Sequence, residues 1–176
     1  MSLIIDGVEI PIDARLDLSV SYQRLERSAM HRIGPSATAI KQTLWSGKYR
    51  VTVSGSGWYP PGLQSVDFSG AVLLASIAPF SKVGGVGDIN IGADTDRRAE
   101  VDYTPYAHAI MVDGSRQDAD LSVAVSGDCT ITPVAGASFY QVFWFPIMSL
   151  IFADPPAEST DMAGITTSWE MVGEQV

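Results

Sequence analysis

The segment Tyr49-Arg50-Val51-Thr52-Val53-Ser54 alternates apolar and polar side chains, and this pattern decides the fold class. Successive side chains of a β-strand point to opposite faces of its sheet, so a period of two buries one face and exposes the other. The alternation recurs over residues 16–22, 120–125 and 165–171. A helix with this period would expose apolar groups all around its surface. The sequence therefore predicts a mostly β protein, an antiparallel β-sandwich or barrel-like domain with long loops and little helix.

Turn and loop signals divide the rest of the chain. Asp6-Gly7 lies between two short apolar runs, so residues 4–10 are predicted to form a hairpin with a type I′ turn. Gln23–Met30 is predicted to form one or two helical turns, and Gln64–Phe68 a short one. Ser81–Gly92 is rich in glycine and low in complexity, which is typical of a flexible loop or an excursion from a sheet.

The length of 176 residues predicts a single domain over residues 1–176, with a loop excursion at 81–120. A chain of this size can bury roughly two-thirds of its unfolded surface and sustain its own core. Charged residues make up 18% of the chain, which is below the typical value of about 25%. Two explanations stay open: other subunits cover part of the surface, or a compact β domain exposes uncharged Ser and Thr side chains.

The net charge of −9 disfavours nucleic acid as a partner, because a polyanion is repelled unless basic residues gather on one face. Arg24, Arg27 and Arg32 fall close together, as do Arg97 and Arg98. Neither group is a basic run with interleaved aromatic residues. We therefore expect these arginines to form local pairs, and we expect no specific binding of nucleic acid.

Two further features narrow the class of protein. Cys129 is the only cysteine, so no intrachain disulfide forms, and its strand-like surroundings predict a buried, inert thiol. The most apolar stretch, Phe139–Phe152, is interrupted by polar residues and a proline and is shorter than the roughly 20 residues that span a bilayer. We interpret it as one or two buried strands, with no membrane span.

Catalytic signatures are lacking in the sequence. A Ser/His mechanism needs an activated nucleophile, and the two histidines, His31 and His108, lie in no recognisable signature. The Ser54–Gly57 segment reads as a tight turn and not as a nucleophile elbow. Gly84-Gly85-Val86-Gly87 lacks the lysine and the helix of a phosphate loop. We expect no enzyme active site.

Carboxylates gather in the middle of the chain and allow two interpretations. The group comprises Asp88, Asp94, Asp96, Glu100 and Asp102. Oxygen ligands of this kind bind calcium, but the spacing does not match the twelve-residue helix–loop–helix pattern. The alternative is a solvated acidic loop that Arg97 and Arg98 partly neutralise. One cysteine and two distant histidines do not make a zinc site. We predict no metal and no cofactor.

Aromatic residues offer a carbohydrate-binding alternative. The candidates for a sugar-stacking platform are Trp58, Tyr59, Tyr103, Tyr106, Tyr140 and Trp144. Apolar neighbours favour a core position for Tyr140 and Trp144. Trp58 and Tyr59 precede two prolines and are the pair expected to be exposed, although rigid packing at a corner is the preferred interpretation.

One stretch carries a resemblance to a known class of protein: Leu44-Trp45-Ser46-Gly47-Lys48-Tyr49-Arg50-Val51-Thr52-Val53-Ser54-Gly55-Ser56-Gly57-Trp58-Tyr59-Pro60-Pro61-Gly62-Leu63. In it a basic strand leads through a Ser-Gly-x-Gly-Trp turn to a Pro-x-Gly-Leu corner, and Asp67 follows. These features, the C-terminal strand Trp169–Val176 and the N-terminal hairpin resemble small tail-tip and baseplate proteins of long-tailed bacteriophages, with the distal-tail type first. The resemblance covers about a third of the chain and assigns a structural corner to Trp45, Gly55, Gly57, Trp58, Pro60, Pro61 and Asp67.

The resemblance implies a structural subunit of the virion tail, assembled in the host cytoplasm. Its partners would be copies of itself in a ring, with a hexamer favoured over a trimer, together with tail-tube and baseplate hub proteins. Free β edges can pair between neighbours in such a ring. The expected contact residues are Gly84, Gly85, Gly87, Arg97 and Arg98. A carbohydrate- or receptor-binding β module of the virion is the second hypothesis, and a cell-wall hydrolase domain is the third.

Overall fold

A computed structural model describes residues 2–33 and 38–176 of the chain. Their contacts group into two compact units. Unit 1 comprises Met1–Glu9 and Leu73–Met148, and unit 2 comprises Ile10–Val72 and Ser149–Val176. The sequence predicted one domain with an excursion at 81–120, whereas this excursion belongs to the body of unit 1.

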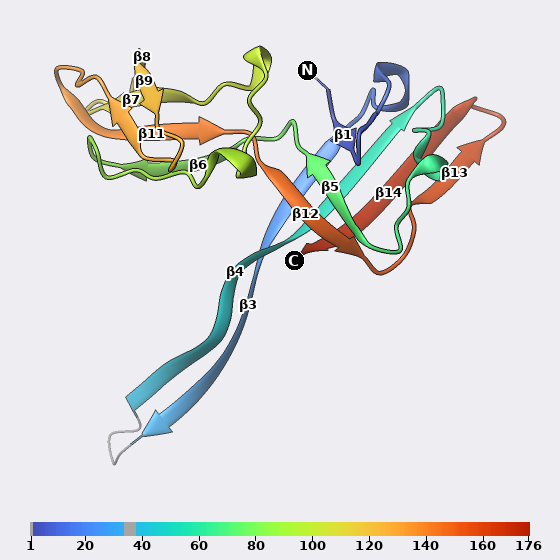
Figure 1. The fold of residues 1–176 in the computed structure, drawn as a ribbon, viewed down its shortest axis with the longest axis horizontal. Coiled ribbons are helices and arrows are strands. Elements are labelled where there is room, and N and C mark those ends of the chain that lie inside the picture. Colours follow the sequence, from blue (N-terminus) through green and yellow to red (C-terminus); the bar gives the residue numbers. More distant parts are fainter. Residues whose placement is uncertain (1, 34–37) are drawn as a thin grey trace. The chain divides into compact units, whose positions relative to one another are not determined.

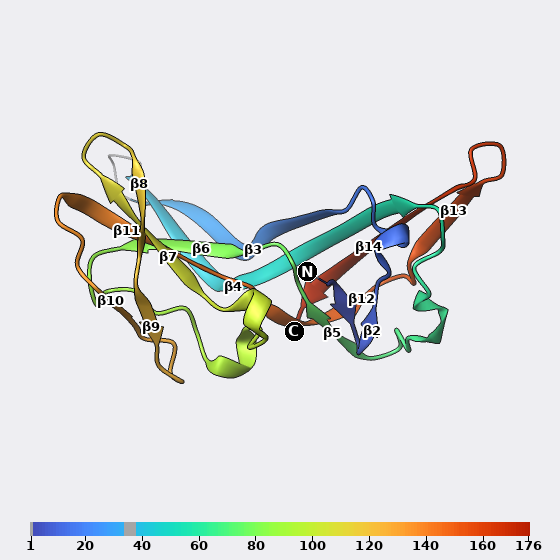
Figure 2. The same cartoon turned by 90° about the horizontal axis from the view of Figure 1, so that it is seen from above.

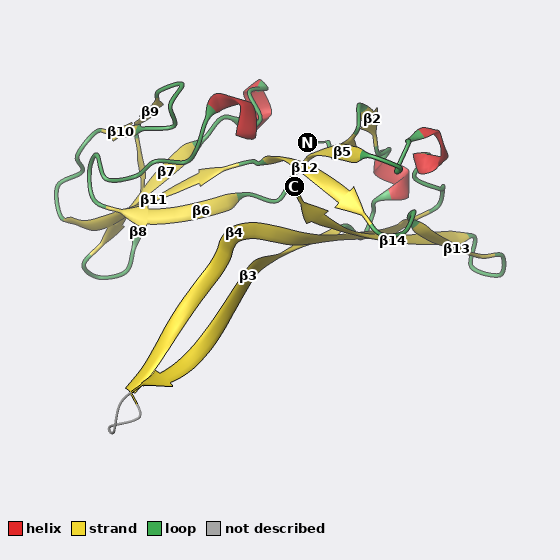
Figure 3. Ribbon diagram, turned by 60° about the horizontal axis from the view of Figure 1, so that its bottom comes forward, coloured by secondary structure: helices red, strands yellow, loops and turns green. Residues whose placement is uncertain are grey.

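Strands dominate both units, and every registered strand pair is antiparallel. This confirms the predicted mostly β fold, and the sheets of residues 2–33 and 38–176 are open and form no closed barrel (Figure 3). Within the described ranges, helical structure is limited to four short 3-10 turns, which are η1 (Ile12–Ala14), η2 (Leu63–Ser65), η3 (Asp94–Asp96) and η4 (Val101–Tyr103).

Unit 2 is organised around a long hairpin of β3 (Ser19–Ile33) and β4 (Thr38–Gly57). The inner part of β4 pairs with β14 (Thr166–Gln175), from Thr167↔Gly57 to Glu174↔Arg50. The other side of β14 pairs with β13 (Ala157–Asp161) and with the end of β12 (Ile147–Phe152). Figure 1 shows β3 and β4 continuing well past the end of β14.

Alternation along β14 builds the core of unit 2. Thr167, Trp169, Met171 and Gly173 are buried, and the residues between them are exposed, as the period of two predicts. The indole of Trp169 lies directly against Gly55 of β4, where a Cβ atom would stand 2.7 Å from the ring. Glycine at this position therefore makes room for the indole.

Unit 1 contains a four-stranded sheet in the order β6-β11-β7-β8 and a two-stranded sheet of β9 and β10 (Figure 2). The strands are β6 (Phe80–Gly84), β7 (Tyr106–Met111), β8 (Arg116–Ala119), β9 (Leu121–Val123), β10 (Cys129–Ile131) and β11 (Ala137–Trp144). One face of the larger sheet packs in an apolar core formed by Ile89, Ile91, Ala107, Ala109, Cys129, Ile131, Tyr140 and Val142. The Cys129 thiol is buried, as predicted, and its burial raises its pKa.

The N-terminal residues of unit 1 form the predicted hairpin. β1 (Ile4–Ile5) pairs with β2 (Val8–Glu9), and β1 also pairs with β5 (Ala71–Ala75). Asp6 and Gly7 both have positive φ, at 47° and 80°, as a type I′ turn requires.

Gln23–Met30 is not helical, so that prediction is wrong. The segment lies inside β3 and pairs with β4 along its length. Its residues have good helix propensity, but propensity is a weak preference that long-range pairing overrides. The predicted helical turn at Gln64–Phe68 is shifted and shorter, because the 3-10 turn covers Leu63–Ser65.

Ser81–Gly92 is also not a loop outside the sheet. Its first residues belong to β6 and pair with β11, and Ile89 and Ile91 are buried in the core of unit 1. Gly84 contributes to this packing, because a Cβ atom there would stand 2.7 Å from the Ile89 side chain. The high glycine content of the segment drew attention away from Ile89 and Ile91, whose alternate spacing places both side chains in this core.

Candidate functional site

The outer part of the β3–β4 hairpin is the candidate functional site. We name residues 24–33 and 38–49 the arm, because they lie beyond Arg50↔Glu174, the last pair between β4 and β14. Within the described residues, the arm strands pair only with each other. Both outer edges of this two-stranded ribbon therefore leave main-chain hydrogen-bonding groups available to a partner.

Side chains of the arm are solvent-accessible over residues 24–32 and 39–49. Within these two ranges most are exposed, three are half-buried and none is buried. Trp45 is 46% exposed, and the other large exposed apolar side chains are Met30, Ile40 and Leu44. A two-stranded hairpin that buries no apolar side chain is marginally stable alone, so the arm gains little stability from its own contacts.

One face of the arm combines apolar and cationic side chains. Alternate residues of β3 point to this face, and each shares it with its registered partner on β4: Leu25↔Lys48, Arg27↔Trp45, Ala29↔Gln42 and His31↔Ile40. No carboxylate lies on it. We name these eight residues the binding face. The opposite face carries Glu26, which forms an ion pair with Lys41, and this contact lowers the pKa of Glu26.

Charge is strongly segregated between the arm and the rest of the chain. Residues 24–49 contain five of the 11 Lys and Arg residues and only one of the 20 Asp and Glu residues. The segment therefore has a formal charge of +4 in a chain whose total is −9, which leaves −13 on the remainder. Interactions between the arm and an acidic surface are favourable, and they weaken as salt screens them.

Two irregularities bend the ribbon. The register shifts between Leu25 and Glu26, opposite Gly47, and again between Arg27 and Ser28, opposite Leu44. Gly47 has a φ of 88°, which suits a bulge that needs the left-handed region. Such bulges increase strand twist and turn side chains to new directions, and here they flank the pair of Arg27 and Trp45.

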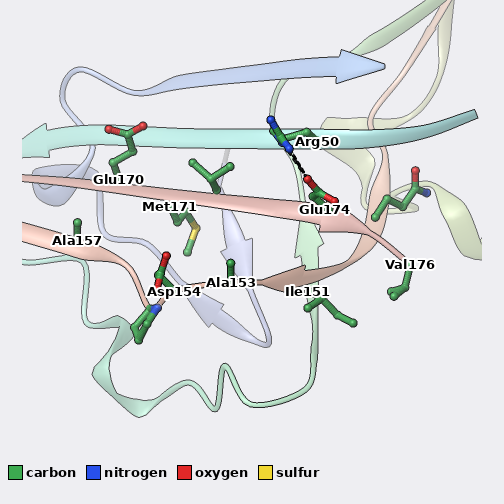
Figure 4. Close-up of a pocket in the computed structure, with 12 residues that line it drawn as sticks. Arg50, Ile151, Ala153, Asp154, Ala157, Glu170, Met171, Glu174 and Val176 are labelled. Carbon is green, nitrogen blue, oxygen red and sulfur yellow. Dashed lines mark hydrogen bonds and ion pairs between the residues drawn. The ribbon is translucent and has the colours of Figure 1, made fainter. Parts of the chain in front are cut away.

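A groove of about 660 Å³ lies beside the C-terminal half of β14, also in unit 2 (Figure 4). Residues 153–156 connect the end of β12 to the start of β13 and do not pair with β14, and the groove forms at this interruption. The apolar residues that line it are Ile151, Ala153, Pro155, Ala157, Met171, Val172 and Val176. Ile151 and Val172 are exposed, so the groove presents open apolar surface.

Three carboxylates line the same groove. Glu174 accepts hydrogen bonds from Arg50, at 3.0 Å from Nε and 2.5 Å from a terminal guanidinium nitrogen. Asp154 and Glu170 are exposed and have no ion-pair partner among the described residues. Figure 4 shows Asp154 and Glu170 without a dashed line to a neighbour. The groove thus has an apolar lining and an excess of negative charge.

The residues assigned to a structural corner occupy different environments. Trp45 lies on the arm, away from any corner. The tight turn predicted at Ser54–Gly57 is wrong, because these residues belong to β4 and pair with β14. Gly57 lies so close to the Asp13 carbonyl that no side chain fits. The segment then turns: Trp58, Tyr59 and Pro60 are exposed, whereas Pro61 is buried. Asp67 accepts a hydrogen bond from the Ser69 amide at 2.9 Å, which lowers the pKa of Asp67.

The contact residues expected from the resemblance are placed within unit 1. Gly84 is packed against Ile89, Gly85 lies close to Asp88, and Gly87 has a φ of 80° in the following turn. Arg97 and Arg98 are buried, so their guanidinium groups are not exposed to a partner.

Both guanidinium groups contact groups of their own chain, which agrees with the local pairing expected from the sequence. Arg97 donates to the carbonyls of Gly92 and Ala124 and pairs with Asp94. Hydrogen bonds from Arg98 lower the pKa of Glu100.

Two of the carboxylates considered for calcium, Asp94 and Glu100, form ion pairs with these arginines. Among the described residues, no three His, Cys, Asp or Glu side chains are arranged to hold a metal ion. Likewise, no helix in the described ranges is long and apolar enough to cross a membrane.

A second exposed surface lies on the outer face of the four-stranded sheet of unit 1. Tyr106 stacks on Phe143 with ring centroids 4.9 Å apart and planes 10° from parallel, and His108 meets both rings edge-on. Nδ1 of His108 is 2.9 Å from Asp118, but the geometry is not that of a hydrogen bond, so this contact is an ion pair only when His108 is protonated. Of the aromatic candidates, Tyr103 and Tyr140 are buried instead.

Comparison of the chain with protein-family models, with curated proteins and with solved structures finds no match. The resemblance to phage tail proteins therefore stays a prediction from the motifs. The arm was missed by reasoning from sequence, although its basic composition and the adjacent Leu44-Trp45 pair were visible in the chain.

Proposed function

We propose that this protein is a structural subunit of a bacteriophage tail tip or baseplate, a ring-forming protein of the distal-tail type that links tail tube and tip. The arm is the single observation that carries the proposal. It extends from its own sheet, buries no side chain of residues 24–32 and 39–49, and presents Trp45 beside Arg27. Exposed apolar patches flanked by polar groups mark protein–protein contact sites.

Ring assembly suits this arrangement physically. A closed ring needs heterologous contacts, in which one surface of a subunit binds a different surface of the next. An element that extends from the body of a subunit and has free edges provides one half of such a contact. The low content of charged residues, 18%, agrees with a chain that covers part of its surface on assembly.

Shortening the arm tests the proposal. Residues 26–47 are replaced by Asn-Gly, which joins Leu25 to Lys48 through a two-residue type I′ turn. We expect the intact chain to form oligomers whose mass rises with concentration. The shortened chain should remain monomeric with a similar melting temperature, because no side chain of residues 24–32 and 39–49 is buried. Sedimentation velocity and thermal unfolding measure both quantities.

A matched control removes other exposed apolar groups and keeps the arm. Met162 and Ile165 lie in the exposed β13–β14 turn, and the variant Met162→Ser/Ile165→Asn is expected to assemble like the intact chain. The proposal fails if the intact chain is a monomer at every concentration, or if the shortened chain assembles equally well.

A carbohydrate- or receptor-binding module is the second candidate function. It is favoured by the stack of Tyr106 on Phe143, since exposed aromatic faces bordered by polar groups such as His108 and Gln141 suit sugar rings. Tyr106→Ala would then abolish binding to an array of bacterial glycans, while Tyr59→Ala, at another exposed aromatic residue, would not. If the intact chain binds no glycan on the array, this candidate function is excluded.

A further inference from the structure

We propose that the binding face of the arm docks into the groove beside β14 of a second copy of this chain. The inference rests on the proposed function and names the surface that receives the arm. Both surfaces belong to unit 2, so every copy carries one arm and one groove. A contact of this kind is heterologous and joins copies in series, which closes into a ring when the rotation between copies permits.

Charge complementarity favours the arm of a second copy of the chain as the partner that binds in the groove. The arm has a formal charge of +4, and the remainder of the chain has −13. The binding face carries Arg27 and Lys48 and no carboxylate, and Lys48 donates a hydrogen bond to the Val176 carbonyl of its own chain at 2.6 Å. The groove carries Asp154 and Glu170 without ion-pair partners among the described residues. Complementary potentials of this type fix the register of an interface and speed its formation.

The apolar parts also correspond. Trp45 and Ile40 are exposed on the binding face, and Ile151 and Val172 are exposed in the groove. Tryptophan and arginine are enriched among the residues that dominate binding energy, and their cross-strand pairing at Arg27↔Trp45 puts both on one face. A groove of about 660 Å³ is large enough to receive an indole with its neighbours.

Nucleic acid is the competing partner for a basic β-ribbon. The same charge distribution argues against it, because the −13 remainder repels a polyanion while attracting the arm of another copy. The arm also has only five basic residues, which limits the number of phosphates it can neutralise. A protein surface with unpaired carboxylates fits the observations better.

Reversing and then exchanging the charges tests the inference. The arm variant is Arg27→Glu/Lys48→Glu, the groove variant is Asp154→Lys/Glu170→Lys, and a third chain combines all four substitutions. Each reversal alone should weaken self-association at least about tenfold, because it opposes like charges across the interface. The combined chain should regain most of the lost affinity, since its charges are again complementary. Sedimentation equilibrium of the full chain measures all four proteins.

Asp102→Lys is the control, because Asp102 is an exposed carboxylate of unit 1 and should not affect association. If the arm reversal weakens association while the groove reversal does not, the docking site is wrong and the proposed function stands. If the intact chain does not associate at all, both are overturned. Binding of a duplex DNA probe that the arm reversal abolishes would also overturn the inference.

Discussion

Trp169→Ala is expected to lower the free energy of unfolding of unit 2 by about 3–5 kcal/mol, the range for truncating a buried tryptophan. The side chain is only 2% exposed, and its Nε1 donates a hydrogen bond to the Ala14 carbonyl at 2.8 Å. Gly55 lies against the ring and has no side chain with which to fill the space that alanine leaves. Urea unfolding followed by far-UV circular dichroism measures the change.

Trp58→Ala is the matched control, since Trp58 is 59% exposed at the turn after β4. It is expected to change stability far less than Trp169→Ala. The sequence favoured rigid corner packing for Trp58, and the structure places the buried indole on β14 instead. Equal losses from the two substitutions would contradict the described core of unit 2.

Arg98→Ala is expected to destabilise unit 1 by about 1–3 kcal/mol, the cost of a buried carbonyl that loses its donor. The Ser76 carbonyl loses the Arg98 guanidinium, whereas the Ser2 carbonyl keeps the Tyr103 hydroxyl at 3.0 Å. The Arg98 side chain is 1% exposed. It donates to the Ser2 carbonyl at 2.5 Å and to the Ser76 carbonyl at 3.3 Å, and its guanidinium carbon lies 3.4 Å from the centroid of the Tyr103 ring. Its ion pair with Glu100 is half exposed and adds little.

Arg116→Ala provides the comparison, because Arg116 is an exposed arginine of β8 in the same unit. Its removal should change the urea midpoint only slightly. If Arg98→Ala were as mild as Arg116→Ala, Arg98 would be free to serve an intermolecular contact, as the resemblance proposed.

The strands could be predicted from sequence wherever one face is buried and the other is exposed. β14 shows this directly, since Trp169 and Met171 are buried and Ser168 and Glu170 are exposed. The turn at Asp6-Gly7 was also predictable, because few residue pairs adopt positive φ in succession. These features depend on local patterning alone.

The arm could not be predicted in this way, because neither of its faces is buried by its own chain. Its β3 strand contains Arg24, Leu25, Glu26 and Arg27, which show no apolar alternation. Only the register with β4 makes this segment a strand, and such pairing is not visible in the residues themselves. The three arginines near position 27 were noted but were expected to pair locally.

The contact residues expected from the resemblance pack within unit 1, and local sequence did not reveal this either. Glycine-rich sequence suggested a loop at Ser81–Gly92, although Gly84 is a glycine because Ile89 packs against it. Adjacent charges suggested a contact surface at Arg97 and Arg98, although backbone carbonyls of unit 1 surround both. Composition does not reveal whether a glycine or an arginine faces solvent or the core.

A complementation experiment tests the arm-to-groove contact most directly. The chain with the shortened arm keeps its groove, and the Asp154→Lys/Glu170→Lys chain keeps its arm, so each lacks one half of the contact. We predict that each sediments as a monomer alone and that an equimolar mixture forms a complex of one copy of each. A mixture in which both chains remain monomeric, under conditions where the intact chain associates, would contradict the account.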